Sequence, residues 1–129
     1  MKTRWLDRRI ACPGPYLALC LSAGEFAAAL KHLGVDSDVP WVKNAHSSAT
    51  AHYFDHPEGR GLVCIVCMRG HEGRNPIEVA GLLVHEAVHA WQAYAEAIGE
   101  RQPGVEQEAY AVQAIAQELM AEFARRMES

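Results

Sequence analysis

The sequence contains the five-residue segment His85-Glu86-Ala87-Val88-His89, an H-E-x-x-H motif. On an α-helix, residues four apart lie on one face about one turn apart, so both imidazoles can bind the same metal ion. The glutamate after the first histidine can reach a water molecule on that ion and take its proton. The motif therefore predicts a Zn²⁺ site with hydrolytic chemistry, in which His85 and His89 are metal ligands and Glu86 is the catalytic general base.

The residues around the motif predict the helix that this chemistry requires. Asn75 is a favourable N-cap, and Pro76 is well suited to the first helical position. Apolar residues then recur at helical spacing through the motif, and Gly99 is typical of a position just past a helix end. We therefore expect a helix from about Pro76 to Ile98, with the motif in its middle.

Length and composition limit the kinds of protein this can be. The chain has 129 residues, half of them apolar, which predicts a single domain over residues 1–129 with a hydrophobic core. The net charge of −4 argues against nucleic acid as a partner, and no apolar stretch is long enough for a membrane span. The basic start and the apolar residues after it faintly resemble a signal peptide. Because Pro13 and Pro15 interrupt that apolar run, we expect a cytoplasmic protein.

The four cysteines do not form a recognisable metal or redox motif. They are Cys12, Cys20, Cys64 and Cys67. The last two have C-x-x-C spacing, but they lie in an apolar run that predicts a strand, where they would point to opposite faces. A redox motif requires a helix N-terminus and a zinc ribbon requires a second pair. We expect buried free thiols in a reducing compartment.

The order of the predicted elements indicates an α+β domain. A buried strand is expected from Tyr16 to Leu21, followed by a helix of about ten residues that Ser22 caps and that ends before Gly34. A hairpin follows, with strands at Ala49 to Phe54 and Leu62 to Met68. The motif helix is next, at Pro76 to Ile98, and a last amphipathic helix runs from Val105 to about Met127. This order predicts helices packed on one face of a small antiparallel sheet.

A catalytic zinc ion usually has three protein ligands, so the motif needs one more. The last helix is the natural source, because a short connection makes it an antiparallel neighbour of the motif helix. Its first turn carries Glu106 and Glu108. Helical periodicity places Glu108 closer to the apolar stripe of that helix than Glu106, and on periodicity alone Glu108 is the inward-facing candidate.

The chain resembles the short zincin-like metallopeptidases of the gluzincin type, in particular small metallopeptidases encoded by phages and prophages. It is also distantly similar to the peptidases that cleave phage-type repressors in bacteria. The resemblance rests on residues 82–92 around the motif and on residues 105–113. In such families the second segment has the form E-x-x-A and its acid is the third ligand. This implies Glu106 as the ligand, and the other carboxylate would accept a hydrogen bond from a ligating imidazole.

The resemblance implies a minimal zincin-like fold and a zinc metallopeptidase acting on a peptide or protein. In that mechanism Zn²⁺ held by His85, His89 and Glu106 activates a water molecule, and Glu86 moves its proton to the leaving amine. The edge strand of such a fold can pair with an extended peptide. Two alternatives stay open: a zinc hydrolase of another amide bond, and a non-catalytic phage assembly or interaction protein on a peptidase scaffold. The intact Glu86 favours an enzyme.

The remaining candidates have weaker signals. Tyr110 lies one turn after Glu106 and is suited to stabilising an oxyanion, although an aromatic residue at such a position is more often part of the packing. We expect Trp91 and Gln92 to belong to the packing between the two helices. Four histidines lack ligand spacing, and we interpret them as structural or solvated residues: His46, His52, His56 and His71.

Overall fold

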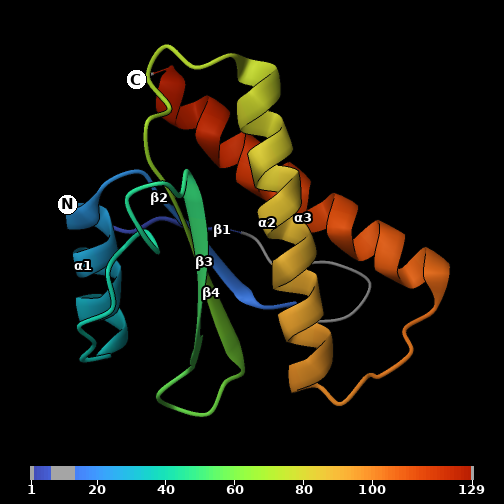
Figure 1. Cartoon of the computed structure of the whole chain (residues 1–129). Helices are drawn as coiled ribbons and strands as arrows, with labels where there is room; N and C mark the ends of the chain where they lie inside the picture. Colours follow the sequence, from blue (N-terminus) through green and yellow to red (C-terminus); the bar gives the residue numbers. More distant parts are fainter. Residues whose placement is uncertain (1, 7–13, 129) are drawn as a thin grey trace.

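A four-stranded sheet lies between helices on both of its faces in the computed structural model, which describes residues 2–6 and 14–128 (Figure 1). Helix α1 covers one face, and α2 and α3 cover the other. The predicted α+β class is confirmed. The elements are β1 (Trp5–Leu6), β2 (Tyr16–Cys20), α1 (Ala23–Leu33), β3 (Ala49–Asp55), β4 (Leu62–Met68), α2 (Pro76–Ala97) and α3 (Val105–Met127).

The sheet is mixed, which corrects the expectation of an antiparallel sheet. Its order is β1-β2-β4-β3, with β3 and β4 forming the predicted antiparallel hairpin. Strands β2 and β4 are parallel, with Tyr16 opposite Val63, and β1 adds an antiparallel pair to β2. Parallel neighbours need a long connection, usually with a helix, and α1 with the segment after it supplies one. That helix also covers the second face, where none was expected.

Strand β4 is the centre of the core, because alternate side chains enter opposite layers. Cys64 packs toward α2 and α3, whereas Cys67 packs toward α1, and both are fully buried free thiols. This confirms the predicted orientation of the C-x-x-C pair. Cys20 is also buried and free, and Cys12 lies outside the described residues.

Local signals set the ends of the helix that carries the motif. Asn75 caps α2, since its Oδ1 accepts a hydrogen bond from the Ile77 backbone N–H at 2.8 Å, and Pro76 occupies the first turn. Removing such a cap typically costs about 1 kcal/mol. After the helix ends at Ala97, the chain turns through Gly99, whose φ of +78° is one that glycine adopts readily. The motif is therefore held in the interior of a regular 22-residue helix.

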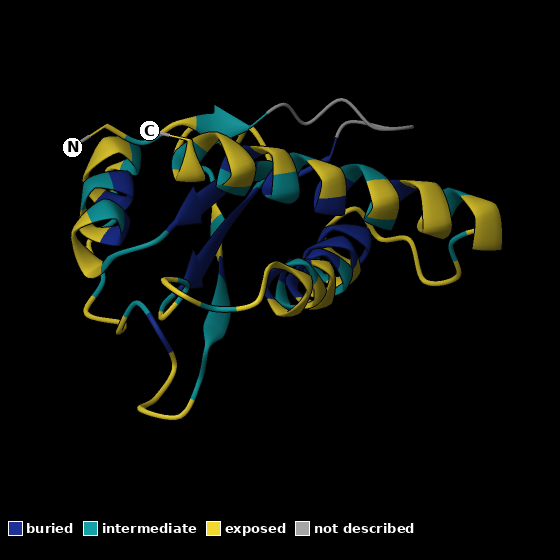
Figure 2. Ribbon diagram, turned by 90° about the horizontal axis from the view of Figure 1, so that it is seen from above, coloured by how far each residue is buried: buried dark blue, intermediate teal, exposed yellow. Residues whose placement is uncertain are grey.

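The buried residues lie where the helices pack against the sheet. Figure 2 shows that the buried residues of α2 lie toward the sheet and that the first turns of α3 extend outward with mostly exposed residues. Trp91 is almost fully buried between these layers, as expected for helix packing. In the part of the chain that the structure describes, none of the helices combines the length and the apolar character needed to span a membrane.

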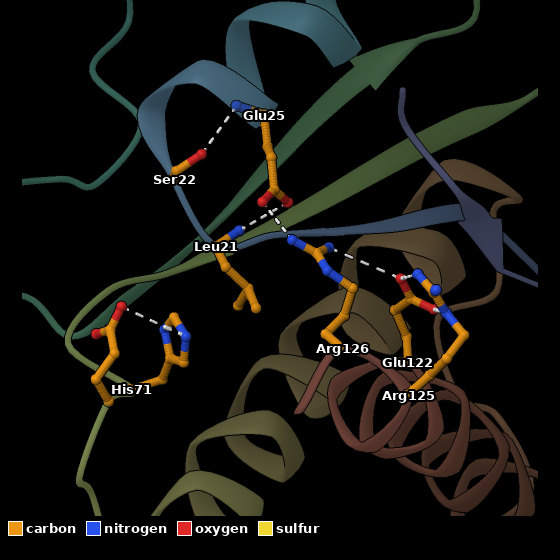
Figure 3. Close-up of polar contacts among 8 residues, drawn as sticks. Leu21, Ser22, Glu25, His71, Glu122, Arg125 and Arg126 are labelled. Atoms are coloured by element: carbon orange, nitrogen blue, oxygen red, sulfur yellow. Dashed lines mark hydrogen bonds and ion pairs between the residues drawn. The ribbon is translucent and has the colours of Figure 1, made fainter. Parts of the chain in front are cut away.

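Ion pairs connect the end of α3 to the N-terminal part of the chain (Figure 3). Glu122 is only 3% exposed, and Arg125 donates to both of its carboxylate oxygens at 2.8 and 2.7 Å. Arg4 lies 3.3 Å from the same carboxylate, and Arg126 pairs with Glu25 at the start of α1.

These arginines determine the protonation state of Glu122. Burial by itself would raise the pKa of its carboxyl group, but the hydrogen bond from Arg125 and the charges of Arg125, Arg4 and Arg126 outweigh it. The net result is a pKa below the ordinary value for glutamate. Glu122 is therefore a charged structural residue at neutral pH.

Candidate metal centre

The two histidines of the motif converge on one point. The Nε2 atoms of His85 and His89 are 3.1 Å apart, and their rings meet nearly edge to face. A tetrahedral zinc ion about 2.1 Å from each nitrogen requires a separation of about 3.4 Å, which is close to the distance found. The pair therefore has the spacing that a single metal ion needs from two imidazole ligands.

Gln92 orients one of these imidazoles. Its Oε1 lies 3.3 Å from Nδ1 of His89, on the exposed side of α2. A proton on Nδ1 that is donated to this oxygen leaves the Nε2 lone pair available for a metal. The prediction that Gln92 belongs to the packing between the helices was wrong, because its side chain is exposed and contacts His89. Its position three residues after His89 is a helical neighbour spacing that could have indicated the contact.

Glu86 is buried on the side of α2 that faces β3 and β4. It is 6% exposed, and it makes no hydrogen bond or ion pair with another described residue. Burial raises the pKa of its carboxyl group, while the neighbouring histidines act in the opposite direction. Burial also raises the pKa of Tyr53 on β3, with smaller contributions from Cys64 and Glu86. Glu86 therefore lies in a largely buried position that favours the protonated form of its carboxyl group.

An open groove of about 540 Å³ leads to the motif. One wall is the segment Ser47–Ala49, where β3 begins, and the other is Arg74 with the first half of α2 up to His85 and Glu86. Strand β3 is at the edge of the sheet, and no described strand pairs with its outer side. The groove thus brings the motif residues together with the start of an edge strand whose outer side is unpaired among the described strands.

A second cavity of similar volume lies beside Trp91, between the end of α2 and the connection to α3. Its lining includes Gln92 and Glu108 but neither His85 nor Glu86. The groove at β3 is the candidate site, because it alone of these two cavities contains the residues with hydrolytic chemistry.

The structure does not bring the predicted third ligand to the histidine pair. Glu108 faces α2, as periodicity predicted, but its Oε2 accepts a hydrogen bond from Trp91 Nε1 at 3.0 Å. At 100° per residue, Trp91 lies about 160° around the helix from His89, so Glu108 contacts the side of α2 that faces away from the histidine pair. Glu106 is exposed. Among the described residues, no three His, Cys, Asp or Glu side chains form a metal-binding group, so the third ligand stays a prediction.

The other aromatic and histidine candidates lie in packing or solvent positions. Tyr110 is 61% exposed. His52 is buried, with its Nε2 2.8 Å from the Trp41 carbonyl oxygen and its ring stacked on Phe26. His71 packs edge-on against Phe123. These contacts agree with structural roles.

Comparison with protein-family models, with curated proteins and with solved structures gives no significant match for this chain.

Proposed function

We propose that the protein is a zinc-dependent metallopeptidase. The observation that carries this proposal is the close approach of two imidazole Nε2 atoms, 3.1 Å apart, next to a buried glutamate that has no cationic partner among the described residues. The groove at the edge of the sheet supports a peptide as the substrate, since an unpaired strand edge can bind an extended backbone.

His85 and His89 would hold the zinc ion, and Gln92 would keep His89 in the tautomer that binds metal. The third protein ligand that the resemblance implies is Glu106. Zinc bound by this pair would supply a Lewis acid that lowers the pKa of water and polarises a carbonyl group.

Glu86 performs the proton transfers in this mechanism. Its carboxylate takes the proton of the attacking water and then delivers it to the nitrogen of the leaving amine. Burial raises its pKa, which makes it a better proton acceptor than an exposed glutamate. No described arginine or lysine pairs with it, so the proton does not have to compete with a salt bridge.

The two alternative functions are less well supported. A hydrolase for another amide bond would use the same residues, but it would not need an unpaired edge strand that begins at the groove. A non-catalytic assembly protein would have no use for a buried carboxyl group without a partner, because such burial is unfavourable. The expected cytoplasmic location and phage origin belong to the proposal.

The proposal is tested by metal analysis together with peptide cleavage. Purified protein is expected to contain about one zinc ion per chain and to cleave members of an unfolded-protein or peptide library. Glu86→Gln should keep the metal and lose cleavage, whereas Glu96→Gln, an exposed substitution on the same helix, should keep both. If wild type and Glu86→Gln are equally inert toward every peptide and amide yet bind a phage or host protein equally well, the assembly function replaces the enzyme.

A further inference from the structure

The end of the groove away from the histidines carries a positive charge. Arg74 lines the groove directly before the N-cap of α2, and its Nη2 donates to Ser48 Oγ at 3.2 Å. Its Nε is 4.0 Å from a carboxylate oxygen of Glu78, whose side chain is 68% exposed. An ion pair this long and this exposed is weak. Arg74 is thus held in place while most of its five N–H donors stay available for a ligand.

The contacts of β3 fix the direction of the groove. Ser48, just before β3, bonds Arg74, whereas Tyr53, later in the strand, lies within electrostatic reach of Glu86. Strand β3 and helix α2 therefore run in the same direction, from Arg74 toward the motif. A peptide that pairs antiparallel with β3 runs the opposite way, so its C-terminal part points toward Arg74.

The distance along the groove corresponds to a few peptide residues. From the first turn of α2 to His85 the helix rises about 14 Å at 1.5 Å per residue. An extended peptide covers about 3.3 Å per residue, so this distance equals about four residues.

We propose that Arg74 is a specificity residue that binds a substrate carboxylate about three or four residues C-terminal to the scissile bond. This inference rests on the proposed function for the position of that bond. The carboxylate is either an acidic side chain or the C-terminus of the peptide, since both have the planar geometry that a guanidinium group binds with two parallel hydrogen bonds. Glu78 is an internal carboxylate that the substrate displaces.

Binding is measured on zinc-loaded protein with the Glu86→Gln substitution, which holds peptides without cleaving them. The probes are three fluorescent octapeptides. The first is neutral with an amidated C-terminus, the second is the same peptide with one glutamate near the C-terminus, and the third is the neutral peptide with a free C-terminal carboxyl group. We expect at least one carboxylate peptide to bind about tenfold more tightly than the neutral amide. The two carboxylate peptides distinguish a side-chain site from a terminal one.

The variants assign any preference to Arg74. Adding Arg74→Gln should remove the preference, whereas Arg69→Gln, a nearby arginine outside the groove, should keep it. Glu78→Gln removes the competing carboxylate and should tighten binding of the carboxylate peptide. It leaves the Arg74 contact with Ser48 intact. If Arg74→Gln does not fold, tighter binding of the carboxylate peptide by Glu78→Gln therefore supports the Arg74 site, and unchanged binding contradicts it.

Equal binding of all three peptides, or a preference that survives Arg74→Gln, overturns the inference. Cleavage by the wild-type protein is scored separately on the neutral amidated peptide. Arg74-dependent binding without any cleavage would sink the peptidase proposal and keep the carboxylate site. Cleavage without an Arg74-dependent preference would keep the peptidase proposal and overturn the carboxylate site.

Discussion

Glu86 and Glu122 are both glutamates buried on helices of the same layer, but their surroundings differ. Glu122 has Arg125 on both of its oxygens and two further arginines nearby, and its pKa is lowered. Glu86 has no cation paired with it among the described residues, and its pKa is raised. Burial disfavours the charged form of a carboxyl group that has no cationic partner, and carboxyl groups with such raised pKa values are concentrated at functional sites. The contrast distinguishes a carboxylate that ion pairs hold in the charged form from one without such pairs, which is the property that the proposed general base requires.

The largest effect should come from removing the histidines beside Glu86. His85→Ala and His89→Ala each leave one imidazole where the pair has two, and we expect both variants to lose the bound zinc that wild type carries. Metal analysis of purified protein after dialysis checks this. Retention of full zinc by both variants would show that the motif is not the metal site.

Glu86→Gln should lower hydrolysis by about 10²–10⁴-fold, because the amide cannot act as a general base. Zinc content should stay at the wild-type level. In the metal-free protein the free energy of unfolding at neutral pH should not fall, since the raised pKa means that burial opposes the charged form. Calorimetry and activity assays measure the two quantities, and a clear loss of stability would remove the contrast with Glu122.

Glu122→Gln should show the opposite pattern, with activity kept and about 2 kcal/mol of stability lost. The pKa of Glu122 is lowered by folding, so its stabilising effect is complete above the unfolded pKa of about 4.3 and is lost as the pH falls through the folded pKa. The difference in unfolding free energy between wild type and variant should therefore shrink in acid. Glu118→Gln on the same helix is the control. A constant difference down to pH 2 would contradict this assignment.

The smallest effect concerns the two acids at the start of α3. The resemblance predicts that Glu106→Gln weakens zinc binding by at least about tenfold and that Glu108→Gln weakens it less. Glu108→Ala should instead reduce stability by about 1 kcal/mol, because Trp91 loses its hydrogen-bond acceptor. Competition with a zinc chelator ranks the affinities. The reverse ranking would favour periodicity over resemblance, and equal affinities would place the third ligand elsewhere.

The elements and the motif could be predicted because their signals are local. Helix α2 was expected from about Pro76 to Ile98 and is found at Pro76–Ala97, since caps and apolar spacing act within a few residues. Helix α3 and the hairpin were predicted with similar accuracy. The convergence of His85 and His89 follows from helix geometry alone.

The features that were missed depend on contacts between distant parts of the chain. The parallel pairing of β2 with β4 leaves no mark on the periodicity of either strand, and β1 has only two residues. Arg74 enters the groove through Ser48, 26 residues earlier, so no short motif could place it there. The position of the third ligand could not be predicted for the same reason. It depends on how α3 packs on α2, and α3 contacts the Trp91 side of that helix and not the side with the histidines.

The parallel pair also has a consequence for synthesis of the chain. Strand β2, with Leu17 to Cys20 all buried in the finished sheet, leaves the ribosome well before β4, because paired positions such as Tyr16 and Val63 are 47 residues apart. During that interval its central edge has no partner, and an unpaired apolar edge promotes aggregation. We therefore expect the nascent chain to be most vulnerable between the emergence of α1 and that of β4, a period in which the later groove does not yet exist.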